Sequence, residues 1–387
     1  MKKKIAILGS TGSIGKTPIN LIENNIKKID VKFLTTNKNA NILFNQAKKL
    51  KVKNVVIYNK LIYEKYKKKF IKNKITVFSD LEKLNKLFKN KIHITVCGIS
   101  GLEGLEPLLS SIEMSKSIAV ANKESIICGW PIIKKKLKKY NTSILPIDSE
   151  HFSIWRLTQK INLKDVDKIY LTASGGPFLN KKFSEIKNVE PKHALRHPNW
   201  KMGKKITIDS ATMMNKVFEV IEANKLFKFD IKKIKILIHP SSYIHSIVKF
   251  KNGTSTMLAH ETNMRIPIGN AIFENYEYDK KFNDLNLKKI NKMKFFKPKI
   301  NQFPTLKLID KLKNNDSYLE IILIAANDEL VKYFLKRKIR YSDIIFYLNK
   351  ILNMSIFKRK FKKKQKTVKE INQVVEIVKS KVKNLVY

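Results

Sequence analysis

The sequence has little cysteine and no long hydrophobic run, and each shortage excludes a class of protein. Two cysteines, Cys97 and Cys128, are too few for a disulfide framework and lack the spacing of a zinc site. We expect both to be small buried side chains in a protein of a reducing compartment. The first apolar segment, residues 5–8, is far too short for a signal core or a membrane span. The sequence therefore predicts a cytoplasmic protein with no membrane partner.

Arginine is also scarce, which changes the meaning of a strongly basic composition. The chain carries 79 Lys and Arg against 32 Asp and Glu, a formal charge of +47 that invites a nucleic-acid role. Only six of these 79 are Arg, and Lys is spread through every segment. Proteins that read nucleic acids favour bidentate Arg and interleaved aromatic side chains. We therefore infer compositional drift and expect no specific nucleic-acid partner, although the charge suits a phosphorylated substrate.

What the first half does contain is a regular alternation of strand and helix patterns. The predicted strands are at residues 4–8, 31–35, 54–57, 94–97, 117–120 and 142–147. The predicted helices between them are at 17–25, 39–50 and 81–89. This alternation predicts an α/β protein whose N-terminal domain is a doubly wound, Rossmann-like parallel sheet.

The second half does not continue the regular alternation of strand and helix patterns. The length of 387 residues suits two or three domains. The predicted segments of the second half are strands at 168–172 and 205–208, a helix at 213–227, a β-rich region at 234–260 with a hairpin signal at Lys251-Asn-Gly253, helices at 319–334, 341–352 and 368–386, and a basic loop at 358–366. We expect four parts: a dinucleotide-binding domain at 1–147, a central α+β catalytic domain at 148–275, a linker at 276–300 and a C-terminal helical domain at 301–387.

Three glycines follow the first predicted strand at a spacing typical of nucleotide-binding turns. Gly9, Gly12 and Gly15 form a G-x-x-G-x-x-G pattern that opens a helix. Glycines permit a tight turn and a close approach of the backbone to a pyrophosphate, which then faces the helix N-terminus. We interpret the segment as a dinucleotide-binding turn, with a merely tight strand-to-helix turn as the alternative.

The end of the second predicted strand indicates which dinucleotide is bound. An NAD site has an Asp or Glu about 20 residues after the turn, where it binds the ribose 2′-hydroxyl. Here the strand ends in Asn37, Lys38 and Asn39, without a carboxylate. Since lysine is so common in this chain, the missing acid carries most of the inference. The sequence predicts NADPH rather than NADH.

Two carboxylates, Asp148 and Glu150, follow the apolar segment 144–147. In an extended chain these i and i+2 side chains point to one face, and a hard cation such as Mg²⁺ or Mn²⁺ would offset their repulsion. The sequence has no His and Cys set that would select zinc. A solvated loop or a helix cap is the alternative interpretation.

A second polar cluster begins with the cap-type residues Asp209 and Ser210 and enters a predicted helix. Asn215, Lys216 and Glu219 share one face of that helix because they are three and four residues apart. Their position among apolar neighbours, one turn from the helix start, indicates ligand recognition. An ordinary intrahelical ion pair is the alternative, and we interpret Glu222, one turn further on, as supporting.

Between these clusters, about residues 174–204, Gly and Pro punctuate both ends of a segment without a long buried pattern. We interpret it as a lid that closes over substrate, with Trp200 and Met202 as its apolar cover. A structured loop with a packed Trp is the alternative. His239 and His245 alternate with apolar residues, so we expect them in the core or at an interface rather than in catalysis.

Taken together, these motifs resemble the 1-deoxy-D-xylulose 5-phosphate reductoisomerase family over nearly the whole chain. The matching segments, in chain order, are 9–15, Ala121-Asn-Lys-Glu-Ser125, Pro146-Ile-Asp-Ser-Glu-His151, Ser174-Gly-Gly-Pro-Phe178, Arg196-His-Pro-Asn-Trp200, Asp209-Ser-Ala-Thr-Met-Met-Asn-Lys216 and Ala325-Ala-Asn327. The chain departs from the family at Asn37, usually Gly, and at Thr262-Asn263, usually Pro-Asp.

The resemblance implies a role for each matched residue. NADPH would be held by Thr11, Gly12, Ser13, Ile14, Asn37, Lys38, Asn39, Asn122, Glu124 and Gly203. A divalent cation, Mg²⁺ or Mn²⁺ with Co²⁺ as a further candidate, would be bound by Asp148, Glu150 and Glu219. Substrate would be bound by Lys123, Ser149, Glu150, Ser174, His197, Ser210, Asn215, Lys216 and Glu219. The catalytic set would be Lys123 with the three metal-binding acids.

The resemblance also implies an activity and an assembly. A homodimer would convert 1-deoxy-D-xylulose 5-phosphate into 2-C-methyl-D-erythritol 4-phosphate by a retro-aldol and aldol rearrangement followed by hydride transfer, in isoprenoid precursor biosynthesis. The rival enzyme is an NADP-dependent dehydrogenase of the semialdehyde type, whose acyl-transfer versions need a nucleophilic cysteine. Cys128 lies in an apolar segment without an evident neighbouring base, which disfavours that rival.

Overall fold

The computed structural model describes residues 2–88, 90–273, 284–359 and 364–387. By its internal contacts the chain divides into two compact units. The first comprises Met1–Ser125, Ile133–Phe152 and Met264–Lys280, and the second comprises Ile126–Ile132, Ser153–Asn263 and Lys281–Tyr387. Both units are therefore built from segments that are separated in the sequence.

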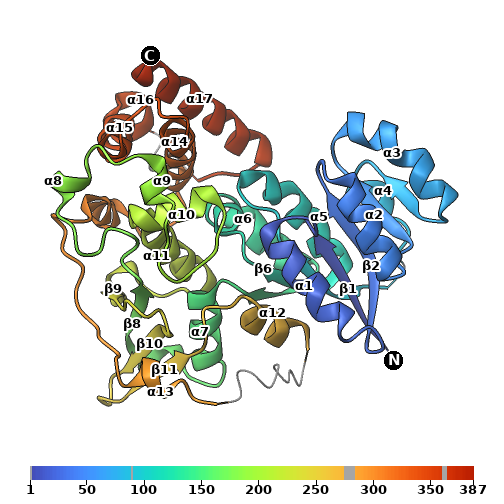
Figure 1. Ribbon diagram of the computed structural model, residues 1–387, viewed down its shortest axis with the longest axis horizontal. Helices are drawn as coiled ribbons and strands as arrows, with labels where there is room; N and C mark the ends of the chain where they lie inside the picture. The colour runs from blue at the N-terminus through green and yellow to red at the C-terminus, as the bar shows by residue number, and fades with distance from the viewer. Residues whose placement is uncertain (1, 89, 274–283, 360–363) are drawn as a thin grey trace. The chain divides into compact units, whose positions relative to one another are not determined.

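The first unit is built on a parallel sheet of seven strands (Figure 1). The strands are β1 (Lys3–Leu8), β2 (Ile29–Thr36), β3 (Asn54–Ile57), β4 (Thr76–Phe78), β5 (Ile92–Cys97), β6 (Ser115–Val120) and β7 (Ser143–Pro146). Their order is β4-β3-β2-β1-β5-β6-β7, so the order reverses between β1 and β5. In open sheets of this kind, ligands bind at the carboxyl ends of the strands beside that reversal.

Helices connect these strands and supply the first unit's apolar layers. They are α1 (Ser13–Glu23), α2 (Ala40–Lys49), α3 (Lys60–Lys72), α4 (Leu81–Asn85), the 3₁₀ turn Leu102–Gly104, α5 (Leu105–Met114), α6 (Lys123–Lys139), whose middle residues belong to the second unit, and α12 (Arg265–Ile272). The central strand β1 is buried from Ile5 to Leu8, which explains its unbroken apolar sequence. Ile5, Ile7, Ile19 and Ile22 share one core with residues of α12.

The second unit contains a smaller sheet of four strands, β11-β10-β8-β9. The strands are β8 (Val166–Ala173), β9 (Ile234–Ile238), β10 (Ile244–Phe250) and β11 (Ser255–Ala259). Strands β10 and β11 form an antiparallel hairpin, and Gly253 in its turn has a φ of 90° that favours glycine. The helix α11 (Met214–Phe227) packs on this sheet, where Val220 and Ala223 join a core with Ile169 and Val248.

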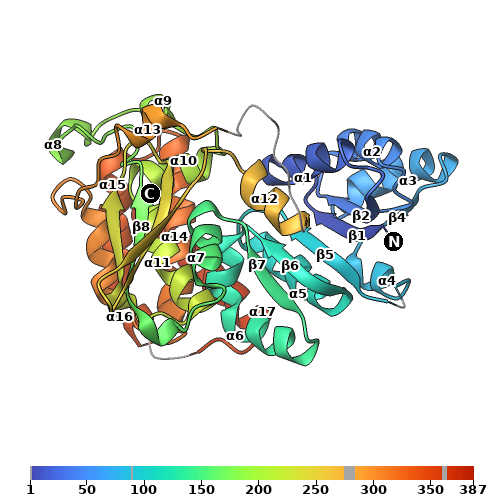
Figure 2. The same cartoon turned by 90° about the horizontal axis from the view of Figure 1, so that it is seen from below.

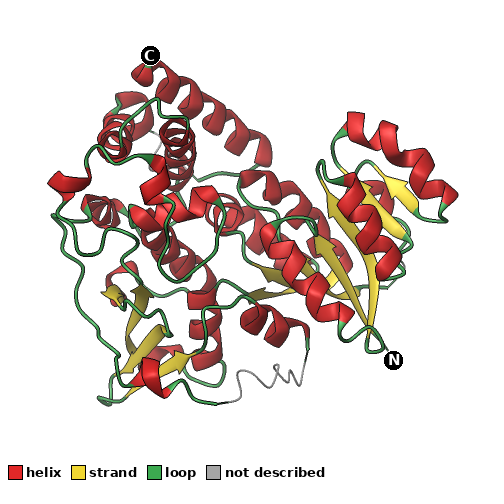
Figure 3. Ribbon diagram, in the orientation of Figure 1, coloured by secondary structure: helices red, strands yellow, loops and turns green. Residues whose placement is uncertain are grey.

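Helices make up most of the rest of the second unit (Figure 3). They are α7 (Ser149–Thr158), which begins in the first unit, then α8 (Phe183–Ile186), α9 (Pro191–Ala194), α10 (Lys204–Ala211), α13 (Leu287–Ile290), α14 (Tyr318–Leu335), α15 (Tyr341–Asn353), α16 (Ser355–Lys358), α17 (Val368–Val386) and the 3₁₀ segments Leu163–Asp165, Ile231–Lys233 and Pro304–Lys311. Helix α14 contacts both α15 and α17 and is buried along most of its length. No helix among the described residues is long and apolar enough to cross a membrane.

The structure confirms the doubly wound parallel sheet, the hairpin at Lys251–Gly253 and the three C-terminal helices. The strand predicted at 205–208 is wrong, because these residues lie inside the helix α10. The helix predicted at 81–89 is shorter, ending at Asn85. Residues 276–283 of the predicted linker, the last two residues of the predicted central domain (274–275) and part of the predicted basic loop (360–363) lie outside the described residues.

Candidate functional site

The glycine turn joins β1 to α1 at the edge of the sheet where the strand order reverses. Gly9 has a φ of 69°, in the left-handed region that favours glycine. A Cβ on Gly15 would lie 2.1 Å from the carbonyl oxygen of Gly9, so only glycine permits this approach of helix to turn. A Cβ on Gly12 would make only ordinary contacts, the nearest at 3.4 Å, so packing alone does not require glycine there. The turn thus has the close packing that a phosphate-binding turn needs.

Helix α1 begins at this turn without a side-chain cap, as judged from the described residues. In the same unit the side chains of Asn59 and Asn122 cap α3 and α6, whereas α2 and α5 have no side-chain cap among the described residues. The first N–H groups of any helix have no intrahelical acceptor, so an uncapped start leaves them for an anion. Local geometry therefore fits the pyrophosphate of a dinucleotide at Thr11–Ile14.

The end of β2 lies directly beside the turn. The Gly9 N–H donates to Thr35 Oγ1 at 2.9 Å, and the hydroxyls of Thr11 and Thr36 are hydrogen bonded at 2.7 Å. The next three residues, Asn37–Asn39, are exposed and have no carboxylate among them. The structure thus brings the two predicted cofactor segments together in one unit.

The start of α6 holds three further predicted residues, Asn122, Lys123 and Glu124, which are all buried. The Asn122 amide donates to the carbonyls of Ile99 and Gly101 at 2.5 and 2.7 Å, and its oxygen accepts from the Ser125 N–H. Asn122 therefore fixes the loop after β5 to the start of α6. Its predicted contact with NADPH stays a prediction.

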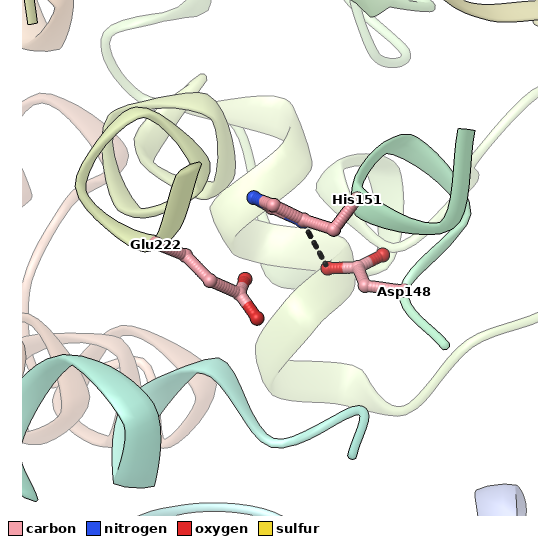
Figure 4. Close-up of side chains that lie close together, drawn as sticks. All are labelled: Asp148, His151 and Glu222. Atoms are coloured by element: carbon pink, nitrogen blue, oxygen red, sulfur yellow. Dashed lines mark ion pairs between the residues drawn. The ribbon is translucent and has the colours of Figure 1, made fainter. Parts of the chain in front are cut away.

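Lys123 and Asp148 form a close ion pair in the first unit. The distance from Lys123 Nζ to Asp148 Oδ2 is 2.7 Å, and His151 Nδ1 lies 3.8 Å from the same oxygen (Figure 4). Burial alone would raise the pKa of the Asp148 carboxyl, but the Lys123 ammonium and the His151 imidazole hold that pKa well below its usual value. Asp148 is therefore an anion over the whole physiological range, as a metal ligand must be.

The chain around Asp148 is not extended, so the argument that placed Asp148 and Glu150 on one strand face is wrong. Strand β7 ends at Pro146 and α7 begins at Ser149, with the Phe152 N–H donating to the Asp148 carbonyl at 2.7 Å. Ser149 Oγ donates to Glu150 Oε2 at 2.6 Å, inside the first turn of α7. Both carboxylates thus belong to a helix start, which disposes them differently from a strand.

Helix α11 of the second unit carries the buried polar face that the sequence predicts. Asn215 Nδ2 and Lys216 Nζ each lie 2.5 Å from a different carboxylate oxygen of Glu219. All three side chains are buried, and Glu219 is completely so. Such a buried carboxylate must be held by charge and hydrogen bonds, and here Lys216 and Asn215 supply both. The intrahelical Lys216–Glu219 ion pair, which is the alternative interpretation of this face, is present, and it also orients Glu219.

Asp209 and Ser210 do not begin this helix, contrary to the prediction. They lie in the last turn of α10, and Met213, with a φ of 61°, makes the break between α10 and α11. The buried Asp209 accepts a hydrogen bond from Asn327 Nδ2 at 2.8 Å and pairs with Lys205 at 3.0 Å. Asn327, which the sequence marked only as part of a motif, thus fixes the helix that carries Ser210.

Ser174 contacts His197 in the second unit, and the segment that carries Ser210 lies against the residues that follow Ser174. A Cβ on Gly176, two residues after Ser174, would lie 3.0 Å from the Ser210 carbonyl, so the two segments touch. His197 Nδ1 accepts from the backbone N–H groups of Asn199 and Trp200, so a neutral His197 carries its proton on Nε2. That nitrogen lies 3.1 Å from Ser174 Oγ, which also accepts from the Gly176 N–H. The Ser174 hydroxyl proton is therefore available to donate to a ligand.

The predicted lid segment contains only the two short helices α8 and α9 and is otherwise irregular. The Trp200 ring lies edge-on to His245 at a centroid distance of 6.1 Å, and His245 stacks on His260 at 3.8 Å. His239 and His245 are buried, as expected for side chains in the core or at an interface. Met202 is partly buried and Gly203 is exposed at the start of α10. Lid closure stays a prediction.

Cys97 and Cys128, both within the described residues, are buried thiols outside any disulfide, as the sequence predicts. Burial raises the pKa of the Cys97 thiol to about 12, so it is not ionised at neutral pH. Neither cysteine is exposed as a catalytic nucleophile would be, which argues against the acyl-transferring dehydrogenase.

Two side chains at the site were missed by sequence reasoning. His151 is completely buried beside Asp148, and Asn199 donates to the Pro240 carbonyl and to Ser242 Oγ at 2.6 and 2.9 Å. The spacing of three residues between Asp148 and His151 was a usable signal, because α7 begins between them. Nothing local in the sequence indicates the Asn199 contact.

Comparisons with known proteins agree with one another. Residues 5–129 match the family model of 1-deoxy-D-xylulose 5-phosphate reductoisomerase, and residues 144–227 and 260–383 match two models of C-terminal domains of that enzyme. The 1-deoxy-D-xylulose 5-phosphate reductoisomerase of Pelagibacter ubique (strain HTCC1062) is 48% identical over 99% of both chains. The relative from Wolbachia pipientis wMel is 40% identical over 89% of this chain and 88% of its own.

Two solved structures are similar over almost the whole chain. The reductoisomerase from Zymomonas mobilis in complex with NADPH covers 100% of this chain and 98% of its own, with 30% identity and a TM-score of 0.89. A DOX-P reductoisomerase in complex with NADPH, fosmidomycin and magnesium covers 99% and 98%, with 29% identity and a TM-score of 0.90.

Proposed function

The chain belongs to the 1-deoxy-D-xylulose 5-phosphate reductoisomerase family, and we propose that Asp148, Glu150 and Glu219 bind the divalent cation of its reaction. The protein is an NADPH- and metal-dependent enzyme that converts 1-deoxy-D-xylulose 5-phosphate into 2-C-methyl-D-erythritol 4-phosphate. The observation that carries the residue assignment is the Lys123–Asp148 pair, which keeps a partly buried carboxylate ionised.

The three proposed metal ligands fit a hard cation. All are carboxylates, and Mg²⁺ and Mn²⁺ prefer oxygen ligands. Asp148 is held as an anion by Lys123, and Glu219 is held by Lys216 and Asn215. When bound, the cation supplies Lewis-acid polarisation of the substrate's carbonyl and a neighbouring hydroxyl.

The first unit fits NADPH. We propose that the backbone at Thr11, Gly12, Ser13 and Ile14 binds the pyrophosphate at the uncapped start of α1, and that Asn37, Lys38 and Asn39 bind the 2′-phosphate. Asn122, Glu124 and Gly203 complete the proposed cofactor contacts. When bound, NADPH supplies the hydride for the reduction.

The second unit supplies most of the proposed substrate contacts. Ser174, whose hydroxyl oxygen accepts from two donors, donates its proton to the phosphate, with His197 fixing its orientation. Ser210, Asn215 and Lys216 bind further phosphate or hydroxyl oxygens. Ser149 and Glu150 at the start of α7 bind the reacting end.

Lys123 is the residue assigned to charge stabilisation during the reaction. The residue is 4% exposed and its ammonium lies 2.7 Å from Asp148 Oδ2, so little water screens its charge. We propose that it stabilises the negative charge that develops on a substrate oxygen during carbon–carbon cleavage and rejoining. Closure of the segment at 174–204, with Trp200 and Met202 as cover, then excludes water from the fragments.

We further propose that the enzyme is a cytoplasmic homodimer of the four parts expected above, with its central part at 148–275 carrying the chemistry. The size of a C₂ dimer is readily measured by sedimentation or by light scattering coupled to size exclusion. A monomer at micromolar concentration would contradict the dimer.

The activity is tested by following NADPH oxidation at about 340 nm with 1-deoxy-D-xylulose 5-phosphate and Mg²⁺, before and after addition of excess chelator. We expect oxidation that requires both substrate and metal and that returns when Mg²⁺ is restored. Asp148→Asn should remove the activity while leaving NADPH binding within about twofold, since the cofactor turn is untouched. Chelator-resistant oxidation would contradict the metal assignment.

A further inference from the structure

The hydroxyl and carbonyl of Ser10, inside the glycine turn, are held by a side chain from a different helix. Gln46 lies on α2 and is buried, as is Ser10. The Ser10 hydroxyl lies 2.7 Å from Gln46 Oε1, and Gln46 Nε2 donates to the Ser10 carbonyl at 3.0 Å. The amide thus satisfies both the side chain and the backbone of one turn residue.

The same residue is also tied to the second strand. The Ser10 N–H donates to the Thr35 carbonyl at 2.9 Å, and the Ser10 hydroxyl lies 3.3 Å from that carbonyl. Together with the Gly9–Thr35 and Thr11–Thr36 bonds, these contacts fix the turn between β1 and α1 to the adjacent β2. Gln46 closes the arrangement from the α2 side.

We propose that Gln46 is a positioning residue for the dinucleotide, acting through Ser10. It holds the peptide between the first and second glycines of the turn, and so sets where the following N–H groups point. The proposal rests on the NADPH site proposed above and adds to it a residue outside the glycine motif. A neutral amide suits this position, because a carboxylate there could not donate to the Ser10 carbonyl and would place two acceptors against each other.

The proposal makes a specific statement about the cofactor. The pyrophosphate is common to NADPH and NADH, whereas the 2′-phosphate belongs to NADPH alone. A residue that positions the turn therefore affects both dinucleotides equally. A residue that reads the 2′-phosphate, as proposed for Lys38, changes the ratio between them.

The test compares Gln46→Leu and Gln46→Glu with the unchanged protein and with a matched control. Asn54→Leu is the control, because the Asn54 amide also donates to a backbone carbonyl, Lys32 at 3.4 Å, but at the amino end of β3. The dissociation constants of NADPH and NADH are measured by titration calorimetry without substrate. The KM for NADPH and the kcat at saturating NADPH are measured on the same preparations, after circular dichroism shows that each variant is folded.

We expect Gln46→Leu to raise the dissociation constants of NADPH and NADH about tenfold, because two hydrogen bonds that fix the turn are lost. The factor should be the same for the two dinucleotides. Gln46→Glu should raise both constants further. The KM for NADPH should rise in parallel while kcat stays within about twofold, and Asn54→Leu should leave binding unchanged. Unaltered affinity in Gln46→Leu, or an equal loss in Asn54→Leu, would overturn the proposal. A loss confined to NADPH would also overturn it, and failure of the unchanged protein to bind NADPH would overturn the cofactor site itself.

Discussion

The close approach of Gly15 to the Gly9 carbonyl predicts that Gly15→Ala lowers the stability of the protein, whereas helix propensity alone predicts that it raises it. Gly15 lies inside α1, where replacing glycine by alanine ordinarily stabilises a helix by about 1 kcal/mol. Here the new Cβ would lie 2.1 Å from Gly9 O and 2.7 Å from Ser10 Cα. These are backbone atoms, which cannot rotate out of the way. The turn would have to move by about 1 Å to restore van der Waals contact.

We expect Gly15→Ala to destabilise the protein by about 2 kcal/mol, because an overpacking cost of about 3 kcal/mol exceeds the gain in propensity. The displaced turn should also weaken NADPH binding by at least about tenfold. Gly12→Ala is the matched control. Its Cβ would lie 3.4 Å from the nearest atom, and alanine at a helix N-cap costs at most about 1 kcal/mol relative to glycine.

Urea unfolding of both variants without cofactor measures the first effect, and NADPH titration measures the second. Because the expected cost is larger for Gly15→Ala, its urea midpoint must fall clearly further than the midpoint of Gly12→Ala. A Gly15→Ala protein as stable as the unchanged one, or more stable, would refute this reasoning. Helix propensity, and not the turn contact, would then decide the stability of this segment.

Three further predictions concern charged side chains. Lys38→Glu should weaken NADPH relative to NADH by tenfold or more, and an unaltered ratio of dissociation constants would contradict our interpretation of the β2 end. Glu219→Gln should raise the Mg²⁺ concentration for half-maximal activity at least about tenfold with NADPH affinity unchanged; an unaltered metal requirement would exclude Glu219 from the metal site. Burial raises the pKa of Glu320 to about 7, although nearby Lys225 lowers it, so the folded protein retains a proton that the unfolded chain releases above pH 4.5. Stability should therefore fall, by up to about 3 kcal/mol, as pH rises from 4.5 to 7, and urea unfolding at pH 5 and pH 8 should show a smaller fall in Glu320→Gln.

The sequence predicts the first unit well because its information is local. Few folds other than this one place three spaced glycines directly after an apolar strand. In the structure the glycine turn lies between β1 and α1, as predicted. The polar face of α11 follows equally directly, since helical spacing alone brings Asn215, Lys216 and Glu219 together. Such patterns need no knowledge of the rest of the chain.

The errors arise where a short pattern fits two structures. Residues 205–208 alternate apolar and polar side chains as a strand does, but four residues do not distinguish a strand from a helix. In the structure they form the middle of α10, where Thr207, Ile208 and Asp209 are all buried. The extended conformation predicted at Asp148 is wrong for a similar reason. The sequence does not show whether the chain stays extended after β7 or enters α7 at once.

The contacts that no local pattern could predict are those between distant side chains. Gln46 reaches Ser10 across 36 positions, and Asn327 reaches Asp209 across 118. Gln46 and Asn327 each lie in a helix whose composition does not mark the amide as important. Only the folded structure shows which residue each amide contacts. The two amides nevertheless fix the geometry of the segments identified from sequence.

The position of α12 has a consequence for how the polypeptide acquires its structure during translation. Ile268 and Ile272 of α12 are completely buried in the core of the first unit, and α12 contacts α1 (Figure 2). The ribosome therefore finishes the seven strands of that unit well before it makes the helix that completes their apolar core. At ordinary elongation rates the interval between Phe152 and Ile272 lasts roughly 10 s. During that time the nascent sheet presents an apolar surface, for which chaperones that bind such surfaces would compete until α12 emerges.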